Sequence, residues 1–260
     1  MLKFLHLSDL HLVPPGVRLH GLIPQEQLDR CVDDVIQKHS QAAFCVVTGD
    51  LTHGGDPIAY GVLRECLARL PMPVHLMLGN HDDRKAFREV FPNVPTDSHG
   101  FVQQAISTTE GRLLLLDTSE IGMPDGRLCE RRLAWLKDRI EEQPESLLFL
   151  FLHHPPFRVG LQRMDSIRLL NGDILFEVLR PHLSRIRHFF VGHLHRMIAG
   201  SWRGIPFSGV RGTSHQIELD FKTSNVASVS FDSPGYGVVM VSSDSTIVHF
   251  EEISRSVMGT

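Results

Sequence analysis

The stretch AFCVVTGDLTHGGD, residues 43–56, holds the pattern that decides the fold of this chain. It opens with apolar and β-branched residues over the length of a strand, which is typical of a strand buried on both faces. The run ends on Gly49 and Asp50, and Thr52 and His53 follow. Packing alone does not explain a carboxylate at the tip of a buried strand. The same arrangement recurs at four other places in the chain.

Short apolar runs alternate with amphipathic segments through the first two thirds of the sequence. The predicted strands are residues 3–7, 43–48, 74–78, 112–117, 147–152 and 188–191. Apolar residues at the spacing of one helix face predict a helix over 28–36, and further helices are predicted near 57–70, 83–91, 129–142 and 173–184. Alternating strands and helices indicate right-handed crossovers between parallel strands, so the fold class is α/β.

The pattern changes after residue 196, where strand follows strand. The segments 197–202, 205–209, 227–231, 236–242 and 246–252 are separated by turn residues and leave no room for helices. We expect residues 196–260 to form a second, mainly antiparallel sheet packed on the first. No linker separates the two parts, so we predict a single domain over residues 1–260.

Composition excludes several classes of function. The chain has 26 Lys and Arg against 30 Asp and Glu and no basic run, so we expect no extended nucleic-acid partner; a small or singly anionic substrate fits better. The four cysteines have no CxxC spacing, which indicates a reducing compartment. Polar residues interrupt the N-terminus, and no apolar run reaches ~18 residues. We therefore expect a soluble cytoplasmic protein with no membrane partner.

Five predicted strand tips carry metal-ligand residue types, and many of the 16 histidines gather there. The tips hold Asp9 and His11, Asp50, Asn80 and His81, His153 and His154, and His193 and His195. Each short motif alone could be an ordinary turn. Ligands of α/β sheets bind beyond the carboxyl ends of the strands, so five such tips in order predict one shared site.

The donor types of these residues predict transition metals. Carboxylate oxygen, amide oxygen and neutral imidazole suit Mn, Fe, Co or Zn, whereas Mg or Ca would favour oxygen alone. Cysteine is absent from the set, which argues against a structural zinc site. Two metals ~3.5–4 Å apart need a ligand that bridges them, and a carboxylate has two oxygens. Asp50 is our candidate for the bridge.

The ordered motifs D-x-H, G-D, G-N-H-D, H and G-H-x-H resemble the signature of the calcineurin-like metallophosphoesterase superfamily over residues 9–195. The resemblance implies a four-layer αββα β-sandwich flanked by helices and a site for two divalent transition metal ions (Mn, Fe, Zn or Co). It assigns one metal to Asp9, His11, Asp50 and His195, and the other to Asp50, Asn80, His153 and His193.

Further stretches resemble the class III cyclic-nucleotide phosphodiesterases and the bacterial glycerophosphodiesterases of that group. They are LHGLIP (19–24), HHPPF (153–157), MDSIRLLNG (164–172) and GTSHQ (212–216). The resemblance implies hydrolysis of a small phosphodiester, a glycerophosphodiester or a cyclic nucleotide, by a water that the metals activate. Asp50 and His81 would be catalytic, with His81 donating a hydrogen bond to the leaving oxygen, and His81, His215 and Asn80 would contact the substrate.

Several alternatives stay open. The ester could be a phosphomonoester, or the fold could serve as a non-catalytic scaffold, although the complete ligand set argues against a scaffold. Arg84, Lys85, Arg168, Arg211 and His154 could meet phosphate, but long basic side chains are most often solvated surface.

Two regions and two further histidines complete the expectations. The 156–172 loop has the length of a lid or binding loop. Edge strands near the C-terminus and segment 216–235 could serve a homo-oligomer. His6 and His249 lie in strand patterns and are predicted to be packing residues.

Overall fold

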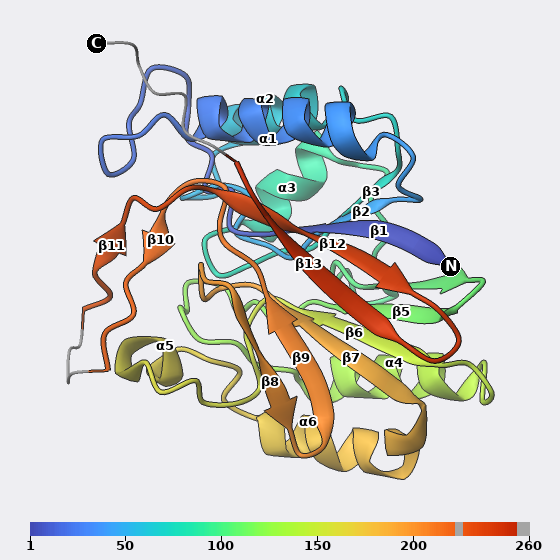
Figure 1. The fold of residues 1–260 in the computed structure, drawn as a ribbon. Coiled ribbons are helices and arrows are strands. Elements are labelled where there is room, and N and C mark those ends of the chain that lie inside the picture. The colour runs from blue at the N-terminus through green and yellow to red at the C-terminus, as the bar shows by residue number, and fades with distance from the viewer. Residues whose placement is uncertain (222–225, 254–260) are drawn as a thin grey trace.

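The computed structural model describes residues 1–221 and 226–253 as two β-sheets stacked face to face, with helices on both outer faces (Figure 1). The first sheet has the order β13 (Thr246–Glu252), β12 (Gly235–Val241), β1 (Leu2–Leu7), β2 (Cys45–Val47), β3 (Val74–Leu76). The second has the order β4 (Gln104–Thr108), β5 (Gly111–Leu116), β6 (Leu148–Leu152), β7 (Ile186–Val191), β9 (Ile205–Gly209), β8 (Ile198–Trp202). This confirms the predicted four-layer α/β fold class.

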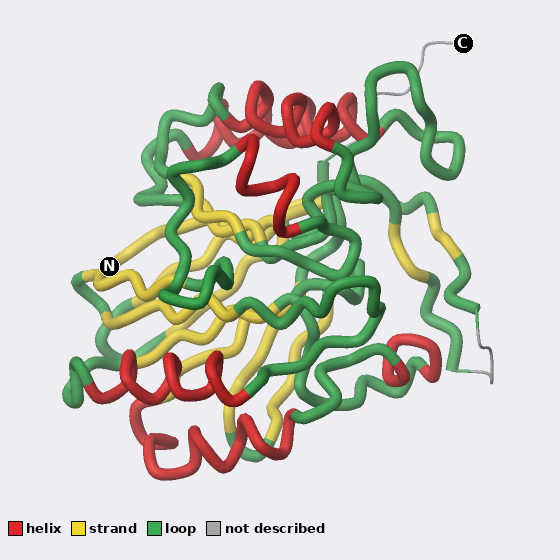
Figure 2. The backbone as a smooth tube through the Cα atoms, turned by 180° about the vertical axis from the view of Figure 1, so that it is seen from behind, coloured by secondary structure: helices red, strands yellow, loops and turns green. Residues whose placement is uncertain are grey.

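The helices pack against opposite outer faces of the sandwich. On the first sheet lie α1 (Pro24–His39), α2 (Pro57–Leu67) and α3 (Arg84–Val90), and on the second lie α4 (Glu130–Glu141) and α6 (Gly172–Leu179) (Figures 1 and 2). The predicted helix over 173–184 ends early, because Pro181 interrupts it and residues Arg180–Arg185 continue as a 3-10 helix. A short helix, α5 (Gln162–Ser166), lies beside the two-stranded ribbon of β10 (Gln216–Ile217) and β11 (Val229–Ser230).

Alternation of side chains along the strands explains why the apolar runs are nearly continuous. In β6, Leu148, Leu150 and Leu152 pack toward the helices of the second sheet. Phe149 and Phe151 point into the cluster between the two sheets. Each central strand therefore buries both faces and has no polar face to show in the sequence.

The prediction of a separate antiparallel sheet over residues 196–260 is wrong. β12 and β13 join the first sheet, with β12 antiparallel to β1. β9 joins the second sheet parallel to β7, and β8 pairs antiparallel with β9. The six earlier strands are also divided between the two sheets, and β4 was not predicted. Without these additions β1 and β7 would be open edges, so the late strands cover both.

Of the remaining predictions on packing, some are confirmed and one is wrong. Cys31, Cys45 and Cys66 are buried free thiols, as predicted. His6 is fully buried and contacts the rings of Phe151 and Phe190, whereas His249 faces solvent on β13, so its assignment as a packing residue is wrong. No helix in the described part of the chain is long and apolar enough to cross a membrane.

Candidate metal centre

The predicted ligands meet where strand ends of both sheets converge. Asp9 and His11 follow β1, Asp50 follows β2 and Asn80 follows β3, while His153 follows β6 and His193 and His195 follow β7. The ligand atoms of Asp9, His11, Asp50 and His195 all lie within 4.8 Å of one another, and those of His153, His154 and His193 do so as well. The six Asp and His side chains among the seven predicted ligands are buried.

The backbone at these tips is left-handed. Asp9, His11, Asp50, His193 and His195 have φ between 46° and 69°. Among the described residues only His20 and Arg203 share this conformation without being glycine. Such backbone is uncommon for residues with a side chain, and clusters of it mark functional sites. The sharp turns aim consecutive polar side chains into one centre.

Glycines allow the motifs to approach one another. A Cβ on Gly79 would overlap the Oδ1 of Asp50 and lie 2.7 Å from Cε1 of His153. A Cβ on Gly49, whose φ is 96°, would lie 2.6 Å from the Gly79 nitrogen. The glycine before Asp50 and the glycine before Asn80 are therefore needed because the two loops are in direct contact.

Asp82 holds the Asp50 loop and the Asn80 loop together through hydrogen bonds. Its carboxylate accepts hydrogen bonds from the backbone nitrogens of Leu51 (3.0 Å), Thr52 (3.0 Å) and Gly79 (3.0 Å) and from the hydroxyl of Tyr60 (2.9 Å). It thus fixes the Asp50 loop against the Asn80 loop without entering the centre. The aspartate that ends GNHD is the sequence signal for this role.

One half of the centre pairs imidazoles with both carboxylates. His11 Nε2 lies 3.4 Å from Asp50 Oδ2 and 3.0 Å from His195 Nε2, and His195 Nε2 lies 3.4 Å from Asp9 Oδ1. His195 Nδ1 donates to the carbonyl of His215 at 2.8 Å, so its Nε2 carries a lone pair. Outward anchoring of one ring nitrogen is the arrangement found for metal-bound histidines.

The other half repeats this arrangement. His153 Nδ1 donates to the carbonyl of Thr48 at 2.7 Å, while its Nε2 lies 3.2 Å from Asn80 Oδ1 and 3.4 Å from Asp50 Oδ2. The His193 ring lies 5.1 Å from that of His153. Asp50 Oδ2 is thus equally distant from an imidazole of each half, which is the position of a bridging ligand.

The charge and hydrogen bonding of the centre fit cations. Burial disfavours the charged form of His153, yet Asp50 and then Asp9 raise its pKa to about 9. The buried carboxylates therefore favour positive charge here. Asp9 Oδ2 and His193 Nε2 are buried with no hydrogen-bond partner among the described residues. Buried polar atoms are rarely left in this state, so the oxygen and nitrogen donors present fit two divalent transition metals.

His81 and His215, the histidines predicted to contact the substrate, line the cavity above the centre, whereas His154 does not; substrate contact itself stays a prediction. The His81 nitrogen donates to Asp50 Oδ1 at 2.9 Å, and its Nδ1 donates to the carbonyl of His53 at 2.9 Å. Its Nε2 is therefore the atom left for a ligand. His154 is buried beside the centre, with Nδ1 2.8 Å from Thr118 Oγ1.

Three polar residues of the cavity wall were assigned no role from the sequence: His20, His53 and Arg163. The cavity has a volume of about 210 Å³. His53 lies three residues after Asp50, within the same motif, and its Nδ1 is 3.2 Å from His11 Nδ1. That short spacing was the available signal. His20 comes from a loop and Arg163 from α5, and the position of both segments depends on the tertiary fold.

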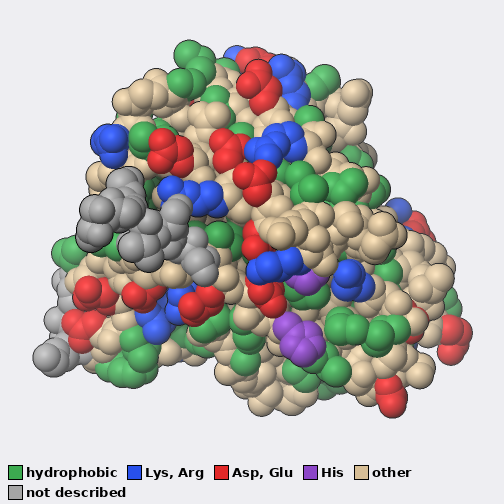
Figure 3. Space-filling view, turned by 45° about the horizontal axis from the view of Figure 1, so that its top comes forward, with side chains coloured by type: hydrophobic (Ala, Val, Ile, Leu, Met, Phe, Trp, Pro, Cys, Tyr) green, Lys and Arg blue, Asp and Glu red, His purple; other side chains and the backbone are tan. Residues whose placement is uncertain are grey.

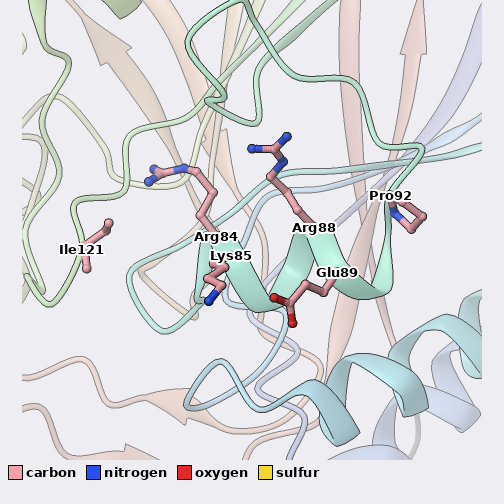
Figure 4. Close-up of a pocket in the computed structure, with 6 residues that line it drawn as sticks. All are labelled: Arg84, Lys85, Arg88, Glu89, Pro92 and Ile121. Carbon is pink, nitrogen blue, oxygen red and sulfur yellow. The ribbon is translucent and has the colours of Figure 1, made fainter.

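The basic residues considered for phosphate lie outside the lining of this cavity. Arg84 and Lys85 border a separate surface pocket on α3 (Figure 4), and Arg84 Nε is 2.8 Å from Asp117 Oδ2. Arg211 pairs with Glu252 at 2.9 Å, and Arg168 donates to the carbonyl of Asp165 at 2.6 Å. On the face in Figure 3, Lys and Arg are interspersed with Asp and Glu. That face has no basic patch for extended nucleic acid.

Comparison with known proteins agrees with this geometry. Residues 2–197 match the family model described as calcineurin-like phosphoesterase. A probable cyclic nucleotide phosphodiesterase of Rhodopseudomonas palustris is 43% identical over 95% of this chain and 91% of its own length. A glycerophosphodiester phosphodiesterase of Enterobacter lignolyticus is 30% identical over 82% of this chain and 77% of its own. A dimetal phosphatase from Danio rerio shares the fold, with a TM-score of 0.72, 15% identity and coverage of 97% of this chain and 96% of its own. The chain therefore belongs to the calcineurin-like phosphoesterase family of hydrolases.

Proposed function

We propose that this protein is a dinuclear metal-dependent phosphodiesterase that hydrolyses small phosphodiesters. The observation that carries the proposal is the position of Asp50 Oδ2, which lies 3.4 Å from the Nε2 atoms of both His11 and His153. One metal would be held by Asp9, His11, Asp50 and His195, and the other by Asp50, Asn80, His153 and His193. The names of the two relatives above support a diester as the substrate.

Charge favours a diester over a more highly charged ester. Two divalent ions beside Asp9 and Asp50 leave a surplus of about two positive charges by formal counting, before an activated water is added. When bound, the metals would supply Lewis acidity and lower the pKa of a water for attack on phosphorus. A singly charged diester then leaves the centre close to neutral.

In this proposal, His81 assists the leaving group. Its Nδ1 is held by the His53 carbonyl and its backbone by Asp50, so the ring is fixed at the edge of the centre. Its Nε2 can donate a hydrogen bond to the oxygen that departs, a role that imidazole fills near neutral pH. Asn80 and His215, in the same wall, would contact the phosphoryl group.

The test compares bis(p-nitrophenyl) phosphate with p-nitrophenyl phosphate, using chelator-treated protein to which Mn²⁺ is added back. We expect metal-dependent cleavage with a clear preference for the diester. In His81→Ala, turnover should fall while the bound metal, measured by elemental analysis, stays near the wild-type amount. Faster cleavage of the monoester would indicate a phosphatase, and cleavage of neither ester would indicate a scaffold.

A further inference from the structure

The cavity above the metal centre has two unlike halves. One half consists of imidazoles, the Asp50 carboxylate and Asn80. The other is formed by α5 and the β10–β11 ribbon, which lie side by side in both views of the fold (Figures 1 and 2). Nothing in the hydrolysis of a phosphodiester requires an apolar wall at this point, so the second half needs its own explanation.

The ribbon turns a consistently apolar face to the cavity. Ile217 and Val229 are directly paired across the two strands, so their side chains share one face. Ala227 lies two residues before Val229 and also lines the cavity, as the alternation of an extended segment predicts. The polar pair Gln216 and Ser230 occupies the adjacent register position, on the opposite face.

The α5 segment supplies the facing side of this half. Met164 and Ile167 are three residues apart, the spacing of one helix face, and both line the cavity. The segment is held in place because Asp165 accepts hydrogen bonds from the nitrogens of Val159 (2.7 Å) and Gly160 (3.2 Å). The wall is therefore formed before a ligand arrives.

Arg163 gives this half a planar cation. It is half-buried at the cavity wall, and its guanidinium has no ion pair with any residue that the structure describes. A guanidinium stacks on aromatic rings and donates in pairs to ring acceptors such as those of a purine. A volume of about 210 Å³ is below the range of ~300–1,000 Å³ found for drug-sized ligands, so a single small ester fits.

We propose that Met164, Ile167, Ile217, Ala227 and Val229, with Arg163 beside them, form a subsite for a heteroaromatic ring carried by the ester. The preferred substrates are then cyclic nucleotides, and glycerophosphodiesters are poor ones, because a glycerol arm would leave the apolar wall in contact with water. This inference rests on the proposed phosphodiesterase function and adds the class of ester to it.

The experiment measures kcat/KM with Mn²⁺ for 3',5'-cyclic AMP and for glycerophosphoethanolamine in three proteins: wild type, Ile217→Thr and Leu219→Thr. Threonine keeps the branched shape but places a hydroxyl in the wall. Leu219 is the matched control, because it lies two residues further on, is 57% exposed and borders a different pocket. We expect the cyclic nucleotide to be preferred and Ile217→Thr to raise its KM about tenfold or more, in the range for small changes in an apolar pocket. The KM of Ile217→Thr for glycerophosphoethanolamine should change less than twofold. The KM values of Leu219→Thr for both substrates should also change less than twofold.

A second measurement does not depend on the fold of a variant. Inhibition of wild-type cleavage of bis(p-nitrophenyl) phosphate by 5'-AMP should be at least tenfold stronger than inhibition by glycerol 3-phosphate, since the two monoesters differ in the group attached. In Arg163→Gln, the ratio between inhibition by 5'-AMP and inhibition by glycerol 3-phosphate should be smaller than in the wild type.

Two outcomes overturn the subsite: a higher kcat/KM for glycerophosphoethanolamine, or equal inhibition by the two monoesters. The absence of metal-dependent cleavage of bis(p-nitrophenyl) phosphate would instead refute the underlying phosphodiesterase function.

Discussion

His53 tests how the metal centre is supported. His153 and His195 each anchor Nδ1 on a backbone carbonyl, but the partner of His11 Nδ1 is His53 Nδ1, at 3.2 Å. Burial, with smaller effects of His81 and His20, lowers the pKa of His53, so the ring is neutral near pH 7 and can accept a hydrogen bond. His11 Nδ1 would then hold the proton and Nε2 would face the centre. His53→Ala removes this acceptor, while the carbonyl that holds His81 remains.

Loss of such an outer partner typically weakens metal binding 10–100-fold, which is about 1.4–2.7 kcal/mol. Only the site formed by Asp9, His11, Asp50 and His195 should be affected directly, because among the described residues His11 is the one predicted ligand whose side chain contacts that of His53. We therefore expect His53→Ala to bind one Mn²⁺ with wild-type affinity and a second one 10–100-fold more weakly.

The assay is a titration of chelator-treated protein with Mn²⁺, followed by calorimetry and by elemental analysis after desalting. His53→Asn is the rescue, because Asn Oδ1 occupies the same bonded position as His Nδ1 and can accept the hydrogen bond. His20→Asn is the control: this exposed residue has a φ of 49°, which Asn tolerates, and its ring is 6.5 Å from that of His53.

Two results would refute the reasoning. If His53→Ala bound both ions with unchanged affinity, its hydrogen bond would have no part in metal binding. If His53→Asn lost as much affinity as His53→Ala, the ring would act through packing and not as an acceptor.

Two further predictions concern the approach of the loops and the core. Gly79→Ala should abolish binding of both metals with the fold retained by circular dichroism, because the added Cβ overlaps Asp50 Oδ1; bound metal in that variant would contradict the geometry. Burial, then His188, lowers the pKa of His6 to about 3, so the unfolded chain binds the extra proton and the free energy of unfolding falls as pH drops below about 6.5. At pH 5 this loss is about 2 kcal/mol. The free energy of unfolding, measured in urea at pH 8 and pH 5, should therefore differ between the two pH values by about 2 kcal/mol less in His6→Asn than in the wild type. An equal difference in both proteins would show that His6 is charged at pH 5 in the folded as well as the unfolded state.

The positions of most strands along the chain, and the polar residues at their ends, could be predicted from the sequence because both depend on local patterns. Apolar runs of strand length mark β1, β2, β5, β6 and β7, and the polar residues directly after β1, β2, β6 and β7 lie at the centre. The choice of partner strand leaves no local signal. A strand buried on both faces has the same hydropathy in either sheet, so the division into two sheets and the placement of β8, β9, β12 and β13 could not be inferred.

The same limit applies to single side chains. His153 and His154 are adjacent and equally buried, yet His153 Nε2 lies 3.4 Å from Asp50 Oδ2, whereas His154 Nδ1 is bound to Thr118 Oγ1. Arg163 directly precedes the stretch MDSIRLLNG, but it reaches the cavity because α5 packs beside the ribbon. Arg84, two residues after GNHD, is instead held by Asp117. Proximity in sequence to a motif was thus a good guide to ligands but did not decide which side chains line the cavity.

The two carboxylates explain how a strained centre keeps its shape. Five left-handed residues cost on the order of 1–3 kcal/mol each, a sum comparable with the net stability of a domain. Asp9 Oδ1 accepts from the His193 nitrogen at 3.1 Å, and Asp50 Oδ1 accepts from the His81 nitrogen at 2.9 Å. In each case one oxygen ties its own turn to the turn of another motif. The other oxygen is left for the centre: Asp9 Oδ2 is buried without a partner among the described residues, and Asp50 Oδ2 lies between two imidazoles. An amide in either place could keep the tie but would lose the charge, so the same two side chains must supply both the backbone support and the negative charge that divalent metals need.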